Sequence, residues 1–369
     1  MLFVTPLLKN AAYPTLSSLG YFRSWRTRQA NPLTVLTYHG VFPEGYVPRS
    51  RLLDGNLISA QRLHRQLSLL KRHYNVICPE EFFRFLDEGI QLPPRAVLLT
   101  CDDGLANVVS DMLPVLEFLQ LKCIFFLTGS SFTDHPEMLW YEELWLLLEA
   151  AQPGSLGFQH FAASVESVPG DALDRHRIWW ELVKQLSKTN AAARRHFIEE
   201  LGSAAKLRHG WKAALLQDPI QRSRFQLLDK QQAEKLVRSG MTVGAHTMDH
   251  PVLAQCTEEI AREEIAGPLK LVPADWNMRI LAYPFGTHET VSARDASLAE
   301  AAGYHCAFMN VGGSVSPHVN RFAVPRIHIT ADMKFGEFEA HASGFHQDIQ
   351  NRLSRSVPPV RSQTALSQS

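Results

Sequence analysis

Two adjacent carboxylates, Asp102 and Asp103, end an apolar run in the stretch VLLTCDDG, residues 97–104. A carboxylate at the end of a buried run is costly in free energy unless it is paired with a cation or bound to a metal. Asp-Asp-Gly is also a frequent sequence in exposed turns. This stretch therefore leaves two interpretations open: an ordinary turn, or a site that holds a positive charge.

A pair of histidines follows another short apolar run, MTVGA. His246 and His250 are four residues apart in HTMDH, although a single histidine is more often a hydrogen-bonded structural residue than a ligand. One carboxylate and two imidazoles are three protein ligands, and three ligands leave metal positions open, as in hydrolytic sites. We hypothesise that Asp103, His246 and His250 bind a divalent metal and that Asp102 stays beside it as a base.

Further polar residues follow apolar runs in the same way. His39 follows LTVLTY, the tripeptide Pro-Phe-Gly of residues 284–286 follows RILAY, and His328 follows VPRI. Each of these is a weak signal alone. In a (β/α) barrel, however, the chemistry lies at the carboxyl ends of the strands. Such a fold would bring all of these residues together.

The apolar runs have the length and composition of buried strands. They are LTVLTY (33–38), NVIC (75–78), AVLLTC (96–101), KCIFFLT (122–128), MTVGAH (241–246), RILAYP (279–284), YHCAFM (304–309) and VPRIHI (324–329). Amphipathic patterns separate them, including one helix that Asp229 caps and Gly240 ends. Alternating strands and helices indicate a parallel sheet. Eight candidates favour an α/β fold, a distorted (β/α) barrel of about seven to eight mostly parallel strands with a helical insertion.

The insertion is predicted at about residues 130–228, where a helical pattern rich in aromatic residues interrupts the alternation. We expect these aromatic side chains to be mainly core. Flat aromatic faces also bind sugar rings, so a ligand platform remains the alternative. The residues concerned are Trp140, Tyr141, Trp145, Trp179 and Trp180.

The composition is that of an ordinary globular protein. The chain has 369 residues and balances 37 Lys and Arg against 37 Asp and Glu, which argues against a nucleic-acid partner. Its five cysteines are scattered and form no Cys-x-x-Cys. This pattern indicates buried thiols in a reducing compartment rather than disulfides or a zinc-thiolate site, so we expect a cytoplasmic protein.

The two ends of the chain differ from the barrel domain, which is predicted at residues 33–341. Residues 1–32 show an amphipathic helical pattern with several basic residues. We expect this helix to pack on its own domain, with peripheral contact to a membrane surface as the alternative. No apolar run reaches the roughly 18 residues of a spanning helix. The polar tail at 342–369 is predicted to be disordered.

Three of the stretches described above resemble the motifs of the polysaccharide deacetylase (NodB-homology) family, carbohydrate esterase family four. The family's first motif, Thr-Phe-Asp-Asp-Gly, is similar to TCDDG at residues 100–104. Its second, His-Ser/Thr-x-x-His, is similar to HTMDH at 246–250, and its third, which ends in Pro-x-Gly, to PFG at 284–286. The resemblance covers roughly residues 33–135 and 229–330.

The resemblance implies a metal-dependent hydrolase that removes N-acetyl groups from a carbohydrate. It implies that Asp103, His246 and His250 bind the divalent metal, usually zinc, with cobalt or nickel as alternatives. The substrate class it implies is a cell-envelope or exported polysaccharide or its precursor.

The resemblance also implies roles for three further groups. Asp102 would take a proton from the water that attacks the acetamide carbonyl. The backbone N–H of Phe285 would help to hold the oxyanion. His328 resembles the histidine that protonates the leaving amine.

The chain departs from the family pattern at the arginine that orients the catalytic base. Ala282 stands at that place, and Arg326 or Arg279 is a candidate replacement. We also expect His39, Tyr283 and Arg326 to contact the substrate.

Two other functions stay open at this point. One is hydrolysis of a different amide on the same barrel. The other is a non-catalytic glycan-binding protein, against which the intact set of base and ligands argues.

Overall fold

The computed structural model describes residues 8–26, 33–133, 135–151, 169–204, 210–273, 276 and 279–356. The chain divides into two compact units. The larger unit is Asn31–Met333, and the smaller combines the described segments 8–26 and 334–356 from the two ends of the chain.

The larger unit is built on a parallel sheet. Its strands are β1 (Leu33–Tyr38), β2 (Asn75–Val76), β3 (Ala96–Cys101), β4 (Ile124–Leu127), β5 (Thr242–Ala245), β6 (Ile280–Ala282), β7 (Cys306–Met309), β8 (Val324–Pro325) and β9 (Ile327–His328). Strands β1, β3, β4, β6 and β7 are buried along their whole length, as expected for strands covered on both faces. Every predicted strand run therefore contains a strand.

The sheet closes through the last strand segment. Its order is β8-β7-β6-β5-β4-β3-β1-β9, and every neighbouring pair is parallel. Only Arg326 separates β8 from β9, and these two short strands pair with opposite ends of the order, β7 and β1. The short β2 pairs with the start of β3 outside this path. The predicted distorted (β/α) barrel is confirmed.

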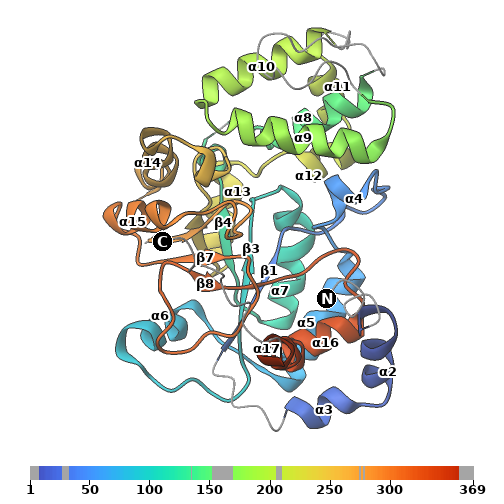
Figure 1. Cartoon of the computed structure of the whole chain (residues 1–369), viewed down its shortest axis with the longest axis vertical. Helices are drawn as coiled ribbons and strands as arrows, with labels where there is room; N and C mark the ends of the chain where they lie inside the picture. The colour runs from blue at the N-terminus through green and yellow to red at the C-terminus, as the bar shows by residue number, and fades with distance from the viewer. Residues whose placement is uncertain are drawn as a thin grey trace, which may run out of the picture. The chain divides into compact units, whose positions relative to one another are not determined.

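Helices surround the barrel (Figure 1). They are α4 (Arg51–Asp54), α5 (Ala60–His73), α6 (Pro79–Glu88), α7 (Leu113–Leu119), α13 (Lys230–Arg238), α14 (Glu258–Ala266) and α15 (Ala293–Ala301). Local sequence sets their ends. The Asp229 carboxylate accepts the Gln232 N–H at the start of α13, and Gly240 has a φ of 72° just past its end, as predicted.

The predicted insertion is present as a cluster of helices, coloured from teal through green to yellow in Figure 1. They are α8 (Trp140–Ala150), α9 (Ala172–Leu186), α10 (Ala191–Ala204), α11 (Trp211–Gln217) and α12 (Pro219–Phe225). Trp140, Trp145 and Trp179 are buried in their common core, whereas Tyr141 and Trp180 are only partly buried and pack against it. The core interpretation therefore holds for the first three. Parts of the insertion, 152–168 and 205–209, lie outside the described residues.

The smaller unit corrects both predicted ends. The N-terminal segment is a chain of three short helices, η1 (Leu8–Ala12), α2 (Tyr13–Ser18) and α3 (Tyr21–Arg26), instead of one long helix. From the C-terminal segment, α16 (Phe335–Ala342) and α17 (Phe345–Ser356) belong to the same unit, so residues 345–356 are helical where a disordered tail was predicted. The remainder of that tail, 357–369, lies outside the described residues.

An apolar cluster explains why both ends fold. Tyr13, Phe22, Ala340 and Phe345 are buried together, with Ile349 packed against them. Burial of these apolar side chains offsets the conformational entropy that residues 345–356 lose when they fold. The prediction of a disordered tail did not include this contribution. No helix in the described ranges has the length and apolarity that crossing a bilayer requires.

Candidate metal centre and active site

Strand ends bring the predicted site residues together. Asp102 and Asp103 directly follow β3, His246 directly follows β5, and Phe285 lies three residues beyond β6. His39 directly follows β1. Because all these strands run parallel, their carboxyl ends meet at one end of the barrel.

The three predicted metal ligands lie close enough to hold one ion. Asp103 Oδ1 is 3.4 Å from His246 Nε2 and 3.4 Å from His250 Nε2. The candidate ligand atoms of the three residues all lie within 4.8 Å of one another, and all three side chains are buried. Asp103 Oδ1 has no hydrogen-bond partner that meets ordinary geometry among the described residues. A buried carboxylate oxygen in this position is suited to a cation.

The histidines are also prepared to act as ligands. His246 Nδ1 lies 2.7 Å from the Ala282 carbonyl oxygen, which can only accept, so Nδ1 donates to it and Nε2, on the side of Asp103, is the nitrogen available to a metal. Burial lowers the pKa of His250, more than the adjacent Asp103 raises it. A neutral imidazole is the form that binds metals. The donor set therefore fits a divalent cation such as zinc.

The backbone around this centre is strained. Of the six non-glycine residues with positive φ in the described part of the chain, four surround the site: Asp103 (72°), Thr247 (62°), His250 (54°) and Phe285 (59°). Each such conformation costs roughly 1–3 kcal/mol and persists only where the surroundings enforce it. The strain is concentrated on the two ligand segments and on the residue expected to hold the oxyanion.

Asp102 is held apart from the ligand set by an arginine. Arg326 Nη1 donates to Asp102 Oδ1 at 2.7 Å, and Arg326 Nη2 donates to Asp102 Oδ2 at 2.6 Å. Arg326 also donates to Thr100 Oγ1 and to the Met309 carbonyl, and neither Asp102 nor Arg326 exposes more than 1% of its surface. Arg326 is therefore the arginine that pairs with Asp102 in a chain that has Ala282 at the motif position.

The position of Arg326 settles two sequence-based questions. Arg279 is exposed at the start of β6, at the opposite end of that strand from the site, so it is not the replacement. The expectation that Arg326 contacts substrate is wrong, because its guanidinium is fully buried beneath Asp102. Burial alone would raise the pKa of Asp102, but the charge of Arg326 holds that pKa below its usual value.

We expect Arg326→Met to shift the acid limb of kcat/KM to higher pH. An adjacent opposite charge lowers a carboxyl pKa by about 1–3 units, so losing the guanidinium should move the limb by about one pH unit or more. Because the pKa of Asp102 is lower in the folded state than in the unfolded state, the ionised carboxylate contributes to the free energy of unfolding at neutral pH. This contribution is lost as the pH falls through the two pKa values, and the Arg326→Met variant lacks it already at neutral pH. Truncating one partner of a buried pair costs about 3–5 kcal/mol.

Arg326→Lys keeps the positive charge but cannot form two parallel hydrogen bonds to Asp102. It provides a second measurement of the acid limb if Arg326→Met folds poorly. The control is Arg279→Met. An acid limb that stays in place in a folded Arg326→Met protein would contradict this assignment of the base.

A cavity of about 430 Å³ opens onto Asp103 and His250. His39 and His328 line it, with ring centroids 4.6 Å apart, and His39 Nε2 lies 4.0 Å from Asp102 Oδ2. Both histidines therefore reach the site as predicted. Burial, with the charge of neighbouring His39, lowers the pKa of His328 to about 3, so His328 is neutral at neutral pH. It must take up a proton before it can act as an acid.

The expectation for Tyr283 is wrong for its side chain. Tyr283 is fully buried, and its hydroxyl donates to the Phe322 carbonyl at 3.1 Å, beneath the sheet end. The next residue but one, Phe285, lines the cavity instead, with its ring 4.9 Å from that of His250.

The cavity wall includes aromatic residues of the set for which a ligand platform was the alternative interpretation, and one polar residue, Asn310, that was not predicted. Tyr141 and Trp180 come from the insertion; the Tyr141 ring lies 4.8 Å from the His250 ring, and the Trp180 ring 5.2 Å from the Phe285 ring. Asn310 directly follows β7 and has a buried Oδ1 without a partner among the described residues. The rule that located the other residues, a polar side chain just after a strand, would have found Asn310.

One sequence-family model matches a stretch of the chain that contains part of this site. The sequence profile described as "Polysaccharide deacetylase" matches residues 169–307, which include His246, His250 and Phe285 but not the Asp102-Asp103 pair. No curated protein sequence matches the chain.

Solved structures share the fold. IcaB from Ammonifex degensii superposes with a TM-score of 0.52 at 19% identity, covering 85% of this chain and 98% of that one. A de-N-acetylase from Aggregatibacter actinomycetemcomitans has a TM-score of 0.50 at 15% identity, covering 84% of this chain and 99% of its own. At such identities the likeness concerns the barrel architecture.

Proposed function

The chain shares the sequence profile of the polysaccharide deacetylase family over residues 169–307, and from this relationship we propose that it is a metal-dependent hydrolase that removes N-acetyl groups from a carbohydrate. The observation that carries the proposal is the division of labour between two neighbouring carboxylates. Asp103 faces the two histidines, whereas Asp102 is bonded to Arg326. One acid is thus suited to a cation and the other to a proton.

Asp103, His246 and His250 would hold the cation. Bound there, a divalent metal supplies a Lewis acid that lowers the pKa of a water and polarises a carbonyl. Three protein ligands leave room for water and substrate, which distinguishes a hydrolytic site from a closed structural one.

The chain's own groups perform the proton transfers. Asp102 is ionised at neutral pH, and each of its oxygens keeps a lone pair beyond the bond to Arg326, so it can take the proton of the attacking water. The water oxygen bonds to the acetamide carbon, and the carbon–nitrogen bond then breaks. His328 lies at the same cavity to return a proton to the leaving nitrogen. The products are acetate and a free amine.

The cavity wall favours a carbohydrate. Pockets of about 300–1,000 Å³ with apolar walls and a few polar groups are typical of small-ligand sites, and this cavity of about 430 Å³ falls within that range. Tyr141, Trp179 and Trp180 provide apolar ring faces, while Asn310 and Glu289 provide polar groups. We propose that the substrate is a cell-envelope or exported polysaccharide, or its precursor.

The cysteines support the compartment that we propose. All five are free, and four of them are buried. Unpaired thiols persist in a reducing environment, so we place the protein in the cytoplasm. Leu19, in the turn after α2, and Tyr21, at the start of α3, are exposed, and we propose peripheral membrane contact there.

Mass spectrometry of oligomers of N-acetylglucosamine and N-acetylgalactosamine after incubation tests the function. We expect a loss of acetyl mass with one acetate released for each amine formed, and no change with Asp102→Asn. Release of ammonia instead would indicate a different amide hydrolase. Binding without any change of mass in metal-loaded protein would indicate a glycan-binding protein.

A further inference from the structure

We propose that Arg194, which lies in the helical insertion, is a positioning residue for the metal ligand His250. With Glu264 it holds Asp249 and thereby fixes the strained loop Thr247–His250. The inference rests on the proposed metal site and adds to it a support that comes from outside the barrel.

The loop cannot hold its shape by itself. Thr247 and His250 both have left-handed backbone conformations, with φ of 62° and 54°. Within the loop, the His250 N–H donates to Thr247 Oγ1 at 3.1 Å. A single hydrogen bond does not offset the strain of two residues held in this conformation. Contacts from other elements must therefore fix the loop.

Arg194 holds the side chain of Asp249. Its Nε and Nη2 donate to Asp249 Oδ2 at 3.0 and 2.7 Å, and Nη2 also donates to Glu264 Oε1 at 2.8 Å. The guanidinium lies 5.5 Å from the ring centroid of Trp140 and is 1% exposed. Asp249 is the residue next to His250, so Arg194 acts one peptide unit from a ligand.

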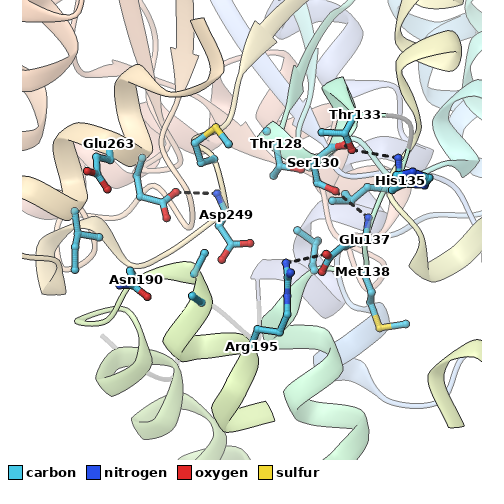
Figure 2. Close-up of a pocket in the computed structure, with 18 residues that line it drawn as sticks. Thr128, Ser130, Thr133, His135, Glu137, Met138, Asn190, Arg195, Asp249 and Glu263 are labelled. Carbon is cyan, nitrogen blue, oxygen red and sulfur yellow. Dashed lines mark hydrogen bonds and ion pairs between the residues drawn. The ribbon is translucent and has the colours of Figure 1, made fainter. Parts of the chain in front are cut away.

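Glu264 of α14 completes the support from the barrel side. Its Oε2 accepts the Asp249 N–H at 2.8 Å, the bond drawn beside Asp249 in Figure 2, and its carbonyl accepts the Met248 N–H at 3.0 Å. Arg194 bonds to the other oxygen of the same carboxylate. Arg194, Glu264 and Asp249 therefore form one closed network across the loop.

Two further contacts hold the loop in place. Trp140 of the insertion donates its Nε1–H to the Asp249 carbonyl at 2.7 Å. Met248 fills a gap between two glycines: a Cβ at Gly129 would lie 2.6 Å from its sulfur, and one at Gly267 would lie 2.3 Å from its Cγ. The Met248 side chain is thus held in close contact with both glycines.

The loop is open on one side, which is why the arginine matters. A cavity of about 470 Å³ borders Met248 and Asp249 (Figure 2), and the Asp249 side chain is 36% exposed. Packing alone does not fix this carboxylate. Arg194, anchored by its Nη1 bond to the Thr189 carbonyl at 2.6 Å, does so.

The test is titration of the metal-free full-length chain with cobalt chloride, following the visible absorption of bound Co²⁺. Groups that support metal ligands from behind contribute about 10–100-fold in affinity, so we expect Arg194→Met to raise the Co²⁺ Kd by about 10-fold or more and to alter the absorption band. Arg194→Lys keeps the positive charge but lacks the several N–H donors of the guanidinium, so it should retain part of the Co²⁺ affinity that Arg194→Met loses. Asp249→Asn should weaken binding to a similar extent, and the double variant with Arg194→Met should be no weaker than the single variants.

Arg224 offers a matched control. It is also fully buried and bonds to two carboxylates, Asp54 at 2.9 Å and Glu142 at 2.8 Å, but it touches neither the loop nor a ligand. Arg224→Met should lower Tm without changing the Co²⁺ Kd.

The outcomes separate this inference from the proposed function. A wild-type Kd and spectrum in folded Arg194→Met, or in Asp249→Asn should Arg194→Met not fold, would overturn the role of Arg194 alone. A wild-type chain that binds no Co²⁺ would overturn the metal site, and this inference with it.

Discussion

Asp102→Asn should retain the metal and lose at least about 100-fold in turnover, the usual contribution of a positioned general base. Asparagine is nearly isosteric with aspartate but cannot take the proton of the attacking water. Asp103 and both histidines remain in place, so metal content measured by elemental analysis should stay at the wild-type level. A modest loss of Tm is expected too, because the new amide N–H₂ group opposes an Arg326 donor where a carboxylate oxygen had accepted.

The neighbouring variant is the control for this result. Asp103→Asn removes the carboxylate that faces both histidines and should weaken metal binding first, since a neutral amide is a poorer ligand. Wild-type turnover in Asp102→Asn would refute the base assignment. Exchanged phenotypes between the two variants would mean that the roles of the two acids are reversed.

His250→Ala should abolish tight metal binding. We expect about one divalent metal per wild-type chain and almost none in the variant, because two remaining protein ligands are too few for a hydrolytic site. The substitution also places alanine at a φ of 54°, so the loop stays strained while it loses the stabilisation that a bound metal gives. His246→Ala should behave alike, since Asp103 Oδ1 is 3.4 Å from each histidine.

His39→Ala serves as the comparison variant. His39 lines the same cavity but is not among the three grouped ligands, so its removal should leave the metal content unchanged. Elemental analysis of all three purified variants decides the matter. Full metal content in both His246→Ala and His250→Ala would place the ion elsewhere.

The sequence by itself determined the barrel and the meeting of the three predicted metal ligands. Apolar runs of strand length alternate with amphipathic helices in the sequence. This local pattern indicates a parallel sheet, because strands that are covered on both faces must be apolar along their whole length. The position of Asp103 and His246 just after such runs then predicted their meeting, since parallel strands end on one side. These inferences need only local periodicity and chain direction.

Tertiary structure alone decided which charged and aromatic residues complete the site. Arg326 lies 224 positions along the chain from Asp102, and whether it would face substrate or Asp102 depended on the closure of the barrel through β8 and β9. Tyr283 follows a strand end like its neighbours, yet its hydroxyl turns into the core to Phe322.

The insertion shows the same limit. Its aromatic pattern predicted a core with a ligand platform as the alternative, but nothing local indicated which aromatic residues would line the cavity or that Arg194 would reach the ligand loop. The folded tail at 345–356 likewise depends on Tyr13 and Phe22 from the far end of the chain. Such contacts arise from packing between distant segments, whose free energy no short stretch of sequence contains.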